Sequence, residues 1–182
     1  KGVVKKIYNS SKYPAEKYLV VGRNDLDRIL KELSQCLSAN VEFKACHECE
    51  YNYNIAISAS KNIPIMPDYV NGSGERLMWI KKFGKQHYQM YLVISRLGGY
   101  AMLYWAKYSH LLVERSIKRH RPPHAIWNPI AASVTSALSK VNIKLIPPSI
   151  LFETINMEYD GKIEGRDNRP SILKLLFSEE LH

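Results

Sequence analysis

Apolar residues near the start of the chain recur with the period of an α-helix. Between Leu26 and Leu37 they are spaced three and four positions apart, which gives a helix one apolar face. Asn24 precedes this run and belongs to the residue types that cap helices, while Asp25 would face the positive end of the helix dipole. We predict a first helix that starts at Asn24, with Cys36 as a small core residue on its apolar face.

The middle of the chain carries the patterns of β-strands. Residues 51–58 alternate between apolar and polar side chains, which is the period of a strand with one polar face. Three later runs are rich in β-branched and aromatic residues, and the Gly98-Gly99 pair between the last two is typical of a tight hairpin turn. These runs are Leu77–Phe83, His87–Arg96 and Tyr100–Tyr108. Together the runs predict an antiparallel meander.

Helical patterns return after these strands. Asn128 followed by Pro129 is typical of a helix start, and an apolar stripe follows it. Two further helical segments are a short turn after Pro147, with Ser149 as its cap, and a terminal amphipathic helix over Ser171–Leu181. Strands in the middle with helices on either side predict an α+β fold, an antiparallel β meander flanked by helices. We expect one compact domain over residues 1–182, a usual domain length.

Composition limits the class of protein. Of 182 residues, 46% are hydrophobic and 24% are charged, the balance of an ordinary globular domain. No apolar run approaches the roughly 20 residues that a membrane-spanning helix needs, and Lys1–Tyr8 carries charge where a signal peptide would be apolar. Three cysteines are an odd and low count, whereas a secreted disulfide scaffold has an even and denser set. We therefore expect a cytoplasmic protein that does not associate with membranes.

The net charge of +9 is distributed unevenly along the chain. Residues 61–144 are basic, whereas residues 24–60 and 145–182 are acidic. The densest basic cluster lies in 118–124, where two prolines would stiffen the backbone and keep the charges exposed. Such asymmetry can steer encounter with an anionic partner. The alternative is a solvated basic surface that binds nothing.

Aromatic residues are abundant, with 12 Tyr and 3 Trp, and many fall on the predicted hairpin. They could stack on the bases of a single-stranded nucleic acid, anchor a protein interface, or pack in the core beneath helices. We combine the basic cluster with two of the hairpin aromatics as predicted partner contacts. This set consists of Arg115, Lys118, Arg119, Arg121, Tyr104 and Trp105.

Cys46-His47-Glu48-Cys49 is the motif with the clearest chemical potential. A CxxC pair can hold half of a tetrahedral zinc site or act as a redox pair. A structural zinc site needs a second pair, which the sequence lacks, and a redox pair should open a helix, whereas a strand-like run follows here. The sequence also lacks the HExxH, P-loop, GxGxxG and GxSxG motifs. We predict no metal, no cofactor and no enzymatic activity.

Several features occur together towards the C-terminus, between His124 and Leu181. They are a lead-in with proline and tryptophan (Pro123–Pro129), an amphipathic helix, the segment Ile143–Leu151, and the ending Ser171–Ser178. With the hairpin Tyr91–Trp105, they resemble bacterial immunity proteins of polymorphic toxin systems, of the contact-dependent inhibition type. The resemblance covers about a third of the chain.

This resemblance implies a small cytoplasmic protein that binds one cognate toxin domain and blocks its active site or substrate path. The chain departs from the family in one respect, because immunity proteins to nucleases are often acidic and this chain is basic. The toxin surface should then be acidic, or the contact should use the acidic segments 24–60 and 145–182. The partner contacts named above rest on charge and exposure and are not transferred by motif.

A nucleic-acid-binding domain is the alternative from a different functional class. It would use the basic 81–121 region together with the hairpin aromatics. Such binding weakens steeply as salt is added, because released counterions drive it. An immunity complex should instead survive moderate salt and show no general affinity for nucleic acid.

Overall fold

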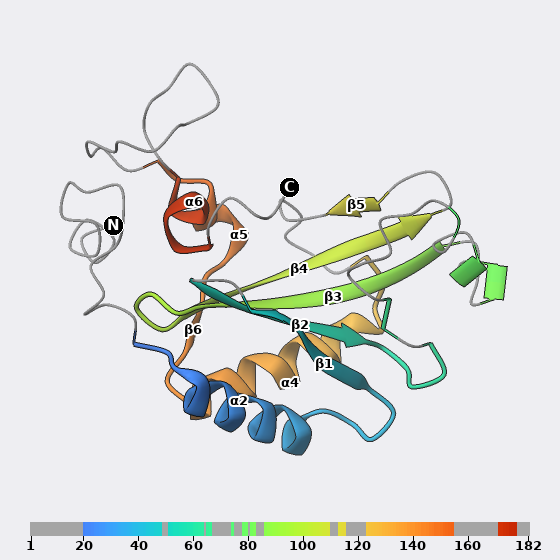
Figure 1. Cartoon of the computed structure of the whole chain (residues 1–182), viewed down its shortest axis with the longest axis horizontal. Helices are drawn as coiled ribbons and strands as arrows, with labels where there is room; N and C mark the ends of the chain where they lie inside the picture. Colours follow the sequence, from blue (N-terminus) through green and yellow to red (C-terminus); the bar gives the residue numbers. More distant parts are fainter. Residues whose placement is uncertain are drawn as a thin grey trace.

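A mostly antiparallel sheet with helices on both faces forms the fold (Figure 1), so the α+β prediction is confirmed. The computed structural model describes residues 20–48, 51–63, 65–66, 74, 78–79, 81–82, 86–109, 113–115, 123–154 and 171–177. The strands are β1 Glu42–Glu48, β2 Asn52–Ser58, β3 Gln86–Ser95, β4 Tyr100–Ser109, β5 Val113–Arg115 and β6 Lys144–Leu145. The helices are α2 Arg23–Cys36, α4 Trp127–Lys140, α5 Pro148–Leu151 and α6 Ile172–Phe177.

The sheet has the predicted meander at its centre. Strands β1 to β5 pair in sequence order, each antiparallel to the next, and β6 adds to β4 in parallel. The turn between β3 and β4 contains Gly98 and Gly99 with φ angles of 74° and 67°. Because residues other than glycine rarely adopt such angles, this glycine pair fixes the hairpin.

Helices α2 and α4 lie side by side on one face of the sheet (Figure 1). Their apolar stripes are buried against inward-facing residues of β2, β3 and β4, which form the first of two core clusters. In α2 the buried stripe consists of Leu26, Ile29 and Leu33, as its spacing predicted. Helical periodicity therefore predicted which face of α2 is buried.

The start of α2 differs from the prediction. The helix begins at Arg23, and its N-cap is Gly22, two residues before the predicted cap Asn24. The backbone N–H of Gly22 donates a hydrogen bond of 2.8 Å to Asp25 Oδ2. A carboxylate in the first turn thus reaches back to the cap, and this contact places the helix start before Asn24.

The opposite face of the sheet is buried as well, under α5 and α6, and it forms the second core cluster. Asn52 and Ser95 face each other across β2 and β3 and are 2% and 0% exposed. Asn52 Nδ2 donates to the carbonyl oxygen of Phe177 at 2.6 Å, and Ser95 Oγ donates to that of Leu176 at 2.5 Å. The polar face predicted for residues 51–58 is therefore largely an interior face: Asn52 pairs with the end of α6, and Ser58 donates to the carbonyl oxygens of Ser60 and Ile63.

The run Leu77–Phe83 is not a strand. Its described residues, 78–79 and 81–82, are helical. The prediction was wrong because so short a run has no period that separates a strand from a helical turn.

The starts of two further helices also shift. Helix α4 begins at Trp127 with Ile126 as its N-cap, and the cap of α5 is Pro147, so neither Asn128 nor Ser149 caps its helix. Helix α6 confirms the first part of the predicted terminal helix Ser171–Leu181, whereas residues 178–181 lie outside the described residues. None of the helices in the described segments is long and apolar enough to cross a membrane.

Candidate functional site

The structure describes little of the basic part of the predicted contact set. Lys118, Arg119 and Arg121 lie outside the described residues. For Arg115 only the backbone is described, in the short strand β5, where it pairs with Ala106. The proposal that these cations contact a partner therefore stays a prediction.

The two aromatic members of that set belong to the core. Tyr104 is 5% exposed and Trp105 is 6% exposed, and they point into the second and first core clusters respectively. Successive residues of a strand point to opposite faces, and helices cover both faces of this sheet. This corrects their assignment as contacts, because neither side chain offers a partner a surface.

Two other hairpin tyrosines, Tyr91 and Tyr108, belong to a largely buried polar chain. The ring of Tyr91 stacks on its cross-strand neighbour Tyr104 at a centroid distance of 5.1 Å. Gln89 Nε2 donates to the Tyr91 hydroxyl at 2.7 Å, and that hydroxyl shares a hydrogen bond of 2.5 Å with Tyr108. Gln89 is fully buried, and its Oε1 accepts from the backbone N–H of Met66. Satisfied polar groups of this kind stabilise a core.

Cys46 is the only member of the CxxC pair whose side chain is described. It is half-buried on β1, and its thiol donates to the carbonyl oxygen of Asn54 at 3.4 Å. Cys49 lies outside the described residues. Within the described ranges no group of three or more His, Cys, Asp or Glu side chains is placed to hold a metal ion.

The water-facing side of α4 is the most distinctive surface that the structure describes. From Trp127 to Ser139 the helix has no charged residue, although about half of these positions face solvent. The exposed ones are small or polar, and Ile126 at the N-cap is 57% exposed. They are Asn128, Pro129, Ala132, Thr135, Ser136 and Ser139. We call this set, together with Ile126, the α4 surface.

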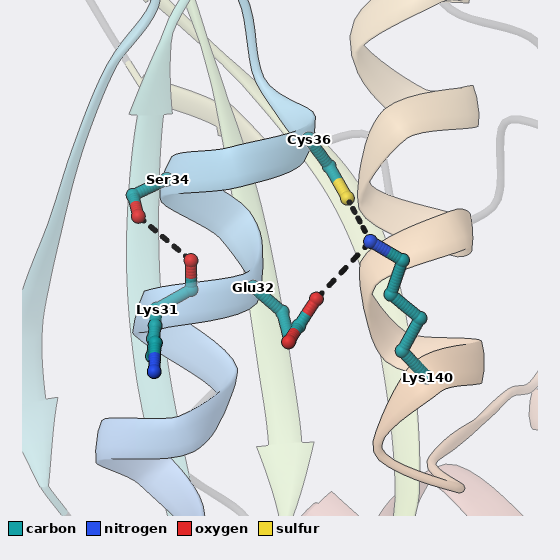
Figure 2. A network of polar contacts seen from close by, with 5 residues as sticks. All are labelled: Lys31, Glu32, Ser34, Cys36 and Lys140. Carbon is teal, nitrogen blue, oxygen red and sulfur yellow. Dashed lines mark hydrogen bonds and ion pairs between the residues drawn. The ribbon is translucent and has the colours of Figure 1, made fainter.

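Charged residues border the α4 surface. Lys140 follows in the last turn of α4, and Glu32 of the neighbouring helix α2 lies beside it (Figure 2). An uncharged centre with a charged edge is the usual anatomy of a protein interface. Sequence reasoning missed this surface, although the absence of charge over thirteen residues of a predicted helix was a readable signal.

Lys140 connects the two helices at one side of the α4 surface (Figure 2). Its Nζ lies 3.2 Å from Glu32 Oε2 and 3.4 Å from Cys36 Sγ, both on α2. Cys36 is therefore half-buried at the edge of the apolar stripe, where it also meets a cation. The contact with Glu32, and next that with Cys36, raise the pKa of Lys140 above its ordinary value of 10.5.

The raised pKa of Lys140 predicts a specific dependence of stability on pH. The folded chain holds this proton more tightly than the unfolded chain, so the contact stabilises the fold below the ordinary pKa of 10.5. That stabilisation is lost as the pH rises through the raised pKa. We expect urea unfolding to show a larger loss of stability from about pH 9 to about pH 11 in the wild type than in Lys140→Met. Equal losses in the two chains would contradict a folding role for this proton.

Comparison with known proteins assigns no family to this architecture. No family model, curated protein or solved structure matches the chain.

Proposed function

We propose that the chain binds a protein partner through the α4 surface and acts as an inhibitor of the immunity type. The observation that carries this proposal is the uncharged, water-facing side of α4 with the exposed Ile126 at its end. Solvated surfaces usually mix charges of both signs, whereas the centres of protein interfaces are depleted of charge. Helix α4 also lies within the segment on which the resemblance to toxin immunity proteins rests. A cognate toxin domain is therefore the partner class we favour.

The burial of three hairpin aromatics weighs against the nucleic-acid alternative. Tyr91, Tyr104 and Trp105 are each less than a tenth exposed, so these three offer no platform on which bases could stack. That alternative would then depend mainly on phosphate contact by basic residues, of which Lys81 and Lys82 are exposed. Phosphate contact alone gives binding that salt disrupts.

A capture experiment separates the two functions. The tagged chain is incubated with lysate of its own cells, with and without nuclease, at low and at moderate salt. We expect one protein to be retained in equal amount at moderate salt after nuclease treatment. Heterogeneous nucleic acid that is released by salt would instead support the alternative.

A charge placed in the α4 surface tests where the partner binds. Ser136→Arg puts a long cation at an exposed position of α4, and we expect it to weaken the complex by about tenfold or more, because the charge would have to lose its water on binding. Ser149→Arg is the matched control, since it makes the same change at an exposed position of α5, on the opposite side of the sheet. Both variants should keep their stability within about 0.5 kcal/mol.

Titration calorimetry with the captured protein measures the effect. If Ser136→Arg binds as tightly as Ser149→Arg, the partner uses another part of the molecule. The α4 surface would then be discarded, while the capture result would still stand.

A further inference from the structure

The contact between Cys36 and Lys140 brings two reactive side chains together from helices that are far apart in sequence. The Nζ of Lys140 lies 3.4 Å from the Sγ of Cys36, and the two side chains point towards each other across the gap between α2 and α4 (Figure 2). The Cys36 thiol is half-buried and takes no part in a disulfide, and the Lys140 side chain is 50% exposed. A small molecule dissolved in water can therefore reach the sulfur.

We propose that Cys36 and Lys140 form a peroxide-sensitive pair, in which oxidation of the thiol is followed by a covalent sulfur–nitrogen bond between the two side chains. In the first step the thiol attacks a hydroperoxide. The O–O bond breaks, an S–O bond forms, and the products are a sulfenic acid on Cys36 and water or an alcohol. Two electrons pass from sulfur to the peroxide. The oxidant is thus a hydroperoxide, supplied from solution.

In the second step the amine of Lys140 displaces the sulfenic hydroxyl. An S–N bond forms, the S–O bond breaks, and water leaves. Before it attacks, the ammonium must give up a proton, which the carboxylate of Glu32, 3.2 Å from the same nitrogen, is placed to receive. A second proton leaves the nitrogen as the S–N bond forms and departs with the sulfenic hydroxyl as water. This step transfers no further electrons from sulfur, so it needs no second oxidant.

The fold favours this second step over competing reactions. Both side chains are in the last turns of helices that pack on the same core cluster, so the nitrogen stays near the sulfur without a change in backbone. A nucleophile held at contact distance competes well with one that must diffuse in. The product would tie α2 to α4 and restrict the unfolded chain between residues 36 and 140, as a disulfide does.

The test is mass spectrometry of the full chain after treatment with a small excess of hydrogen peroxide. We expect a species lighter than the reduced chain by two hydrogen atoms, with a digest that contains the Cys36 peptide joined to the Lys140 peptide. A thiol reductant should reverse it. Because a disulfide gives the same change in mass, the peptide map is decisive, and a Cys46→Ser/Cys49→Ser chain, which keeps only Cys36, provides a second measurement.

Two variants separate this chemistry from a purely structural contact. Lys140→Arg keeps the positive charge beside the sulfur, but we expect it to accumulate sulfenic acid, trapped with dimedone, and no crosslink. Cys36→Ser should give no crosslink to Lys140 and no dimedone label on the peptide that contains position 36. On oxidation the Tm should rise in the wild type and remain unchanged in Lys140→Arg. The proposal is overturned if wild-type Cys36 oxidises without joining Lys140, if it resists peroxide, or if the crosslink persists in Lys140→Arg.

Discussion

Replacing Trp105 by alanine is expected to lower the free energy of unfolding by about 3–5 kcal/mol. Trp105 lies on β4 directly opposite Met90 of β3, and its side chain packs beneath α2 and α4 with 6% of its surface exposed. Removing the indole deletes a large apolar contact and leaves a cavity that this layer can fill only in part. Urea denaturation followed by circular dichroism measures the loss.

Two control substitutions show whether the loss of stability comes from burial of the Trp105 side chain. Trp105→Phe keeps most of the apolar volume and should cost much less than the alanine change. Phe152→Ala removes an aromatic ring that is 37% exposed and should cost about 1 kcal/mol or less. If Trp105→Ala were as mild as Phe152→Ala, Trp105 would not be a core residue, and its role as a partner contact would be open again.

Trp105 also illustrates what the sequence could and could not predict. Its strand was predictable, because the run Tyr100–Tyr108 has strong β propensity and Gly98-Gly99 precedes it. Its burial was not, because period two places Trp105 and Tyr104 on opposite faces without showing whether either face is covered. Here both faces are covered, so both residues are interior.

Other features of the structure could not be predicted from the sequence, for reasons that differ from one feature to the next. The short run Leu77–Phe83 carries no period that separates strand from helix, and its described residues are helical. Cys36 and Lys140 are 104 positions apart, so helical spacing gave Cys36 its place on the stripe but not its neighbour. The α4 surface was readable as an absence of charge. Only the packing of α4 showed which of its residues face water.

Removing the two donors that hold the end of α6 is expected to lower the free energy of unfolding by about 2–4 kcal/mol in the double variant Asn52→Ala/Ser95→Ala. The carbonyls of Leu176 and Phe177 end a short helix and accept hydrogen bonds from these two side chains. Leu176 and Phe177 are each 1% exposed, so water cannot easily replace the lost donors at their carbonyls. The cost should be seen in urea unfolding and as faster amide exchange in α6.

The two substitutions should not be additive. Asn52 and Ser95 lie directly opposite each other in the β2–β3 ladder, and their acceptors are consecutive residues. Once one substitution has loosened the end of α6, water can reach the second carbonyl, and the second change should therefore cost less than it does alone. A double-mutant cycle measures this coupling, which we expect to be about 0.5–1 kcal/mol or more.

Ser34→Ala is the matched control, because Ser34 Oγ also donates to a backbone carbonyl, that of Lys31 at 2.7 Å, but on an exposed turn of α2 (Figure 2). Its loss should change stability by about 0.5 kcal/mol or less, since water replaces the donor. If Ser34→Ala and Ser95→Ala cost the same, the buried carbonyls of α6 have another source of donors. If Ser95→Ala costs clearly more, the buried Ser95 hydroxyl stabilises the fold through its contacts with Leu176 and Leu97, and faster amide exchange in α6 would assign part of that cost to α6. That outcome would explain why polar residues such as Asn52 and Ser95 occupy a buried face of the sheet, although their pattern in the sequence suggests a face exposed to water.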